Sequence, residues 1–155
     1  MEEQQWIEEI LNQGECDEET RALAEVAFSE NPTEAHTKLS LAMALSKSKD
    51  SHDRQRSIQL FEELIVSNQF VEICYYNLSL LYYSIENYTK ASMYVQEFMI
   101  LNPEQQQGRK LHKAIAYRQS KEKDEETQQN IVMAGLVGVA AVGLFALSKA
   151  FSKRR

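Results

Sequence analysis

The sequence predicts an all-α body of six helices followed by one C-terminal transmembrane helix. Glycine is scarce in that body: of five glycines only Gly14 and Gly108 lie within residues 2–126, whereas a β-rich domain needs many more turn residues. Apolar residues recur there at the three- and four-residue spacing of helices. From Ile131 to Leu147 the chain then carries no charge, as a membrane span requires.

Six body helices are expected from this spacing, at residues 17–30, 33–47, 52–67, 70–85, 88–101 and 103–126. A short amphipathic piece before them ends at Gly14. Two Asn-Pro pairs, at Asn31 and Asn102, are interpreted as helix starts, because Asn caps free amides and Pro suits the first turn. The chain is therefore divided into an arm (1–16), a helical domain (17–126), an anchor (130–151) and a basic tail (152–155).

Charge is distributed unevenly along the 155 residues. The net charge is −6, but the 13 basic and 23 acidic side chains upstream of Lys149 leave −10, and the basic residues that follow add +4. Because a body with this negative charge repels phosphate backbones, we expect no nucleic-acid partner. Cys16 and Cys74 are too few for a disulfide framework, so we expect reduced thiols, as in the cytosol. The start, MEEQQ, predicts neither a secretory signal nor a transit peptide.

Residues 72–105 fit a 34-residue tetratricopeptide repeat. Its aromatic, leucine, small and proline positions are occupied by Tyr75, Leu78, Ser79, Tyr82, Tyr88, Ala91 and Pro103. Phe98 departs from the pattern, since a small residue is usual there, and the preceding window, 38–71, fits loosely. The alternative is a helical bundle with ordinary apolar stripes. Two repeats are fewer than a stable array needs, so the flanking helices are expected to cap the ends of a tetratricopeptide-like bundle.

The uncharged run is interpreted as a single tail anchor. As a helix, residues 130–151 rise about 33 Å, against a hydrocarbon core of about 30 Å. A buried core helix is the alternative, but the run has no polar face. We expect insertion after translation, with the body in the cytosol and targeting by the basic residues Lys149, Lys153, Arg154 and Arg155. Ala134 and Gly138 form a close small-residue pair, so association of anchors into a homo-oligomer stays open.

No catalytic pattern is found in the sequence. His36, His52 and His112 lie far apart, and none has a second ligand at metal-binding spacing. The chain has no phosphate-binding glycine loop and no nucleophile motif. We therefore expect a binding module without enzymatic activity, metal or cofactor.

A partner groove is expected on the concave face of the repeats, which the first helix of each repeat lines. Its predicted residues are Leu39, Ala42, Met43, Ser46, Ile73, Tyr76, Asn77, Leu80 and Tyr83. This apolar, aromatic surface suits an amphipathic helix or an extended apolar peptide. Alternatively, this face packs against the chain's own N-terminal arm through Trp6, Ile7 and Ile10. The arm would then be autoinhibitory, because a partner would have to displace it from the groove.

A chaperone clamp for an acidic peptide would need cations in this groove. Only Asn77 fits that pattern, and Gln107 and Leu111 stand at the positions of its basic residues. A tail-anchored receptor for chaperones or imported precursors therefore remains the second hypothesis, and a structural membrane scaffold the third.

From about Leu41 to Gln107 the chain resembles the mitochondrial fission 1 protein family. The strings that carry the resemblance are LSKSK (45–49) with Asp53, LFEEL (60–64), YSIENY (83–88), KA (90–91), YV (94–95) and NPE (102–104). Met43 in place of an aromatic residue and Leu81 in place of glycine depart from it. The resemblance implies an adaptor on the outer membrane of mitochondria, and often of peroxisomes. Such an adaptor recruits a dynamin-related GTPase, directly or through adaptor proteins, for organelle division.

Overall fold

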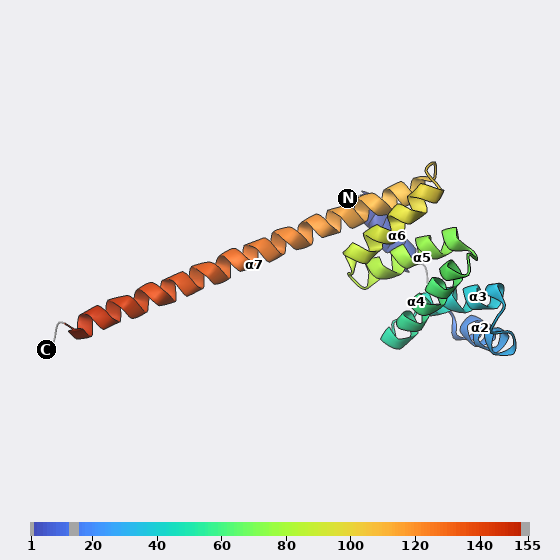
Figure 1. The fold of residues 1–155 in the computed structure, drawn as a ribbon, viewed down its shortest axis with the longest axis horizontal. Helices are drawn as coiled ribbons and strands as arrows, with labels where there is room; N and C mark the ends of the chain where they lie inside the picture. The colour runs from blue at the N-terminus through green and yellow to red at the C-terminus, as the bar shows by residue number, and fades with distance from the viewer. Residues whose placement is uncertain (1, 13–15, 153–155) are drawn as a thin grey trace. The chain divides into compact units, whose positions relative to one another are not determined.

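The computed structural model describes the backbone of residues 2–12 and 16–152, and the side chains of residues 4–11, 16–130 and Met133. Within them the chain forms helices and no strand, which confirms the all-α class. The helices are α1 (Glu2–Asn12), α2 (Glu18–Glu30), α3 (Ala35–Ser46), α4 (Ser51–Val66), α5 (Val71–Ser84), α6 (Tyr88–Leu101) and α7 (Gln106–Ser152) (Figure 1). The chain divides into two compact units, residues 1–117 and 118–155, and α7 contributes to both.

In the first unit, each helix from α2 to α6 packs against the next, and α3 also contacts α5. Helices α3 and α4 form one hairpin and α5 and α6 a second, which correspond to the two predicted repeat windows. Three helices are capped at their N-termini by the side chains of Asp17, Asp50 and Asn87. Each cap satisfies backbone amides that have no partner within the helix.

The two Asn-Pro pairs do not begin helices, so that part of the sequence prediction is wrong. The amides of Asn31 and Asn102 donate to the carbonyl four residues earlier, which closes α2 and α6. Each Asn carbonyl then accepts from the amide three residues later, forming a turn whose second residue is proline, where its fixed φ fits. Helices α3 and α7 therefore begin at Ala35 and Gln106 rather than at 33 and 103.

One apolar core joins the helices of the first unit. Its largest fully buried side chains include Ile7, Leu41, Leu45, Phe61, Leu64, Leu78, Val95, Leu111 and Ile115. Ala91, the small residue predicted at a helix crossing, is also completely buried. Ile85, the last residue of the predicted helix at 70–85, lies just beyond the end of α5 and is 36% exposed.

The predicted helices at 103–126 and 130–151 form one continuous helix, α7, so the predicted helix count is wrong at this point. Between them the chain reads ETQQN, which contains neither Pro nor Gly, and nothing in it ends a helix. The side chains of the predicted anchor other than Met133, and those of Lys149, Lys153, Arg154 and Arg155, lie outside the described residues. Within the residues that the structure describes, no helix has the length and apolarity needed to cross a membrane.

Candidate partner-binding face

The nine residues predicted to line the groove lie in different surroundings. Ala42, Leu80 and Tyr83 are buried, Met43 and Ile73 are 41% and 42% exposed, and Leu39, Ser46, Tyr76 and Asn77 are half-buried. On α5, the residues near the N-terminus are accessible and those near the C-terminus are covered. The structure thus places an open surface at one end of the predicted face.

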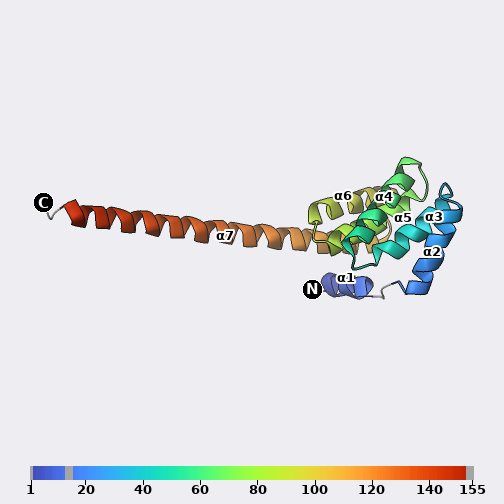
Figure 2. The same cartoon turned by 90° about the horizontal axis from the view of Figure 1, so that it is seen from below.

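Helix α1 contacts α5 near its C-terminus. The Tyr83 hydroxyl donates a hydrogen bond to Gln4 Oε1 at 2.7 Å, and Gln4 Nε2 donates to the carbonyl of Ala114 in α7 at 2.9 Å. One side chain of α1 therefore connects α5 to α7. Figure 2 shows α1 beside the first turns of α7.

The predicted arm residues face inward from α1. Ile7 is fully buried in the core, and Trp6 and Ile10 pack against it partly buried. The Lys110 ammonium of α7 lies 5.5 Å from the centre of the Trp6 ring, within cation–π range. Apolar packing, hydrogen bonds and a cation–π contact thus hold α1 in place beside α5 and α7.

A pocket of about 220 Å³ remains open between α5, α6 and the start of α7. Ile73, Tyr76 and Phe98 provide its apolar surface, with the Tyr76 and Phe98 ring centres 5.2 Å apart. Its polar lining residues are Glu72, Asn77, Gln105 and Gln107. Burial raises the pKa of Tyr76 above its ordinary value of 10.0, so its hydroxyl stays protonated at neutral pH and can donate a hydrogen bond.

Sequence reasoning missed Phe98, which lines the pocket, and Gly108, which lies against the Phe98 ring. Phe98 is 4% exposed, and a Cβ built on Gly108 would lie 2.9 Å from two of its ring carbons and 3.1 Å from Met99 Cγ. The ring therefore occupies space that exists only because residue 108 has no side chain. Two signals were present: Phe98 departs from the repeat pattern, and Gly108 is one of two glycines in residues 2–126.

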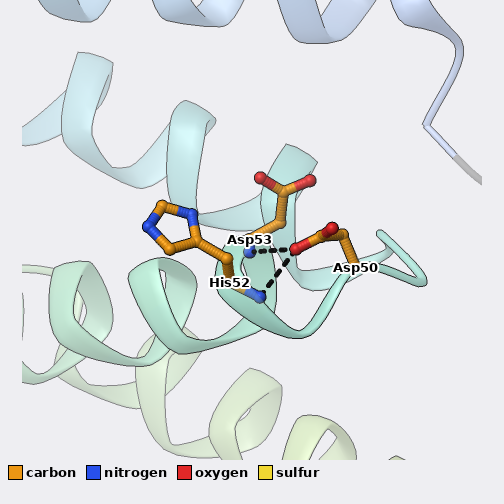
Figure 3. Close-up of side chains that lie close together, drawn as sticks. All are labelled: Asp50, His52 and Asp53. Atoms are coloured by element: carbon orange, nitrogen blue, oxygen red, sulfur yellow. Dashed lines mark hydrogen bonds between the residues drawn. The ribbon is translucent and has the colours of Figure 1, made fainter.

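A second cluster, Asp50, His52 and Asp53, has possible metal-ligand atoms within 4.8 Å of one another. Figure 3 shows one Asp50 oxygen accepting from the amides of His52 and Asp53, at 2.7 and 3.3 Å. These bonds, the His52 amide first, hold the pKa of Asp50 below its ordinary value of 3.8.

Asp53 in this cluster is buried and already paired. Arg21 of α2 donates to one of its oxygens at 3.1 Å and lies 3.0 Å from the other, and Ser48 Oγ donates at 2.7 Å. The two carboxylates thus cap α4 and attach α2 to it. Their arrangement is explained by helix capping and ion pairing, and it does not require a metal.

The chain is 34% identical over 151 residues to the curated Mitochondrial fission 1 protein of Candida albicans, covering 95% of this chain and 93% of that protein. This chain belongs to the mitochondrial fission 1 protein family. The crystal structure of the fission protein Fis1 from Saccharomyces cerevisiae covers 72% of this chain and 89% of its own, with a TM-score of 0.65 and 17% identity, and shows the same fold. No protein-family model matches the chain.

Membership of the mitochondrial fission 1 family confirms the resemblance seen in residues 41–107 and extends it. The aligned length includes sequence on both sides of the repeats, so the similarity is not restricted to a generic helical-repeat core. The shared fold with Fis1 independently supports the hairpin arrangement of α3 to α6.

Proposed function

We propose that this chain is a tail-anchored adaptor of the mitochondrial outer membrane that recruits a dynamin-related GTPase for organelle fission. Recruitment is direct or through adaptor proteins, and the body faces the cytosol. The observation that carries the proposal is the 34% identity over nearly the whole chain to a curated Mitochondrial fission 1 protein. The open pocket at one end of α5 supplies the surface for recruitment.

The anchor is part of this proposal and rests on the sequence. The run from Ile131 to Leu147 has no charged residue and is followed by four basic residues and no acidic one. A helix over residues 130–151 matches the thickness of a bilayer, and Lys149 can extend its ammonium toward the interface. Anchoring at the end of the chain keeps the helical hairpins at the membrane surface, where a recruited GTPase would act.

The lining of the pocket argues against the chaperone-receptor hypothesis. Glu72 is the ionised residue among those that line it, and a clamp for acidic peptides needs cations instead. Leu111, at one of the expected basic positions, is fully buried. A pull-down with full-length protein in detergent separates the hypotheses, because it retains a dynamin-related GTPase or its adaptors in one case and a heat-shock chaperone in the other.

Complementation tests the proposal directly. The full chain is expressed in a Candida albicans strain that lacks its own Mitochondrial fission 1 protein, and the mitochondrial network is imaged. We expect restored fission, while a chain that stops at Glu126 is produced but does not restore it. Full-length protein that reaches mitochondria at normal levels yet leaves the network unchanged would refute the proposed function.

A further inference from the structure

The geometry points to the pocket between α5, α6 and α7 as a specificity pocket that takes one large apolar side chain of the partner with a Lys or Arg next to it. The cation pairs with Glu72, and the apolar side chain packs on Ile73, Tyr76 and Phe98. This inference rests on the proposed function only in taking the partner to be a protein.

The size and the floor of the pocket fit one side chain. Its volume of about 220 Å³ is below the ~300–1,000 Å³ typical of small-molecule and cofactor sites. Ile73 is 42% exposed, a large apolar surface that loses water only when something covers it. Truncation of a partner's side chain typically has its largest effects where that side chain fills a well-packed pocket from which water is excluded.

Two polar groups at the pocket are available for the partner's main chain. Among the described residues, the Tyr76 hydroxyl and the Gln107 amide make no hydrogen bond, although both line the pocket. Asn77 differs, since its Nδ2 already donates to the Ile73 carbonyl at 2.8 Å. A peptide whose side chain enters the pocket must satisfy the backbone groups it buries, and these two groups can do so.

The negative charge at the pocket favours a basic residue next to the partner's apolar side chain. The pocket lining holds one acidic residue, Glu72, which is exposed. From the side chains that the structure describes, its carboxylate accepts one long contact, 3.4 Å from Gln105 Nε2. Upstream of Lys149 the chain carries −10 overall, so an acidic peptide is repelled and a basic one attracted. A lysine or arginine beside the apolar anchor therefore complements both the pocket and the body.

Gly108 fixes the depth of the pocket through Phe98. A methyl group at residue 108 would approach the Phe98 ring to 2.9 Å, too close for carbon atoms, so the ring would have to move. Because that ring contacts Tyr76 at 5.2 Å between centres, its movement changes the floor on which the anchor packs. Gly108 is thus a residue that determines specificity without touching the partner.

The experiment is a selection of phage-displayed random 12-residue peptides on the full chain in detergent, for wild type and four variants. On wild type we expect enrichment of Leu, Phe or Met next to Lys or Arg. Glu72→Gln should remove the basic preference and weaken the best synthetic peptide about fivefold at low salt, as for an exposed ion pair. Glu97→Gln makes the same charge change on an exposed residue outside the pocket and should change nothing.

Gly108→Ala should shift the enriched anchor from Leu or Phe toward Ala or Val, and Gly108→Ala with Phe98→Leu should restore the larger anchors. Thermal unfolding confirms which variants are folded. The inference would be overturned if the peptides selected on wild type show no enrichment of Lys or Arg. It would also be overturned if Glu72→Gln selects the same peptides as wild type. Both results can be read even if the Gly108 variants do not fold. Unchanged anchors on folded Gly108→Ala protein would overturn the role of Gly108.

The two proposals fail separately. Peptide selection uses purified protein and is independent of mitochondria, whereas complementation measures fission in cells. Restored fission without the peptide preference rejects the specificity pocket alone. The peptide preference without restored fission rejects the proposed function alone.

Discussion

Tyr76 and Tyr83 lie seven residues apart on α5, on one side of the helix, yet only one is open to a partner. Tyr76 is half-buried beside the pocket, whereas Tyr83 is 5% exposed and bonded to Gln4. Leu80 between them is 9% exposed, so removing its side chain would cost stability, typically ~2–5 kcal/mol for a buried leucine. Variants that test recruitment should therefore change Ile73 and Tyr76 and leave Leu80 intact.

Ala91 tests the packing of the second hairpin at the level of one residue. It is completely buried, so Ala91→Leu forces three extra carbons into a filled space and should lower the free energy of unfolding by ~1–3 kcal/mol. Urea unfolding of the chain ending at Glu126 measures this. Ala116→Leu, at an exposed alanine of α7, is the matched control and should stay within about 0.5 kcal/mol of wild type. Equal midpoints for the two variants would contradict the assigned packing.

Asp50 should make the stability of the fold depend on pH in a direction that can be predicted. Its folded-state pKa is lowered, so its contribution to stability is complete above 3.8 and is lost as pH falls through the folded-state value. Asp50→Asn keeps a capping oxygen without a titrating group. The difference in unfolding free energy between wild type and variant should therefore shrink as pH falls from about 5 to below 3. A difference that grows on acidification would show that the cap does not favour the ionised carboxylate.

At the scale of elements, periodicity predicted every body helix, because amphipathic spacing reflects burial directly. The boundaries at Asn31 and Asn102 were missed, since the same Asn-Pro sequence can open a helix or close the preceding one, and the choice depends on the turn that follows. The join of two predicted helices into α7 was missed because the change from a polar to an apolar composition near residue 130 does not itself end a helix.

Helical spacing also predicted some of the residues of the candidate site, but not the contacts between distant helices that complete it. Helical spacing put Ile73, Tyr76 and Asn77 on one face, and the structure brings all three to the pocket. Helical spacing could not show that the Phe98 ring fills the space left by Gly108. Nor could it show the hydrogen bond between Gln4 and Tyr83, which lie 79 residues apart in the sequence. Such contacts depend on the packing of helices that are distant in sequence, which periodicity does not encode.

Helix α1 is the element whose removal should affect both stability and binding. Deleting residues 1–12 removes the buried Ile7 side chain and the Gln4–Tyr83 hydrogen bond, with an expected loss of roughly 2–4 kcal/mol. It also uncovers Tyr83, so a partner that binds along α5 should bind more tightly. Titration of the recruited partner against folded deletion variant and wild type measures the change. Weaker binding by the folded variant would mean that α1 forms part of the partner's site.

At the scale of the whole molecule, an acidic body is followed by an uncharged run and then by basic residues. This order predicts that the full chain is held in a membrane by the uncharged run. The full chain should resist carbonate extraction, whereas a chain ending at Glu126 should be soluble and cytosolic. Neutral residues in place of Lys153, Arg154 and Arg155 should move protein from mitochondria toward the endoplasmic reticulum, because a basic end favours the outer membrane in such anchors. Full-length protein released by carbonate would contradict the anchor, and unchanged localisation of the neutral variant would contradict the targeting role.

The most direct test of recruitment compares wild type with Ile73→Ala/Tyr76→Ala in cells that lack their own family member. The amount of dynamin-related GTPase on mitochondria is measured together with the level of the adaptor there and, on purified protein, its helical circular dichroism. Met93→Ala, at a 61% exposed residue of α6 outside the pocket, is the control. Loss of these anchors should cost ~2 kcal/mol or more of binding, so GTPase recruitment and fission should be lost while adaptor level and helicity stay unchanged. Undiminished recruitment by the folded, mitochondrial double variant would contradict the account.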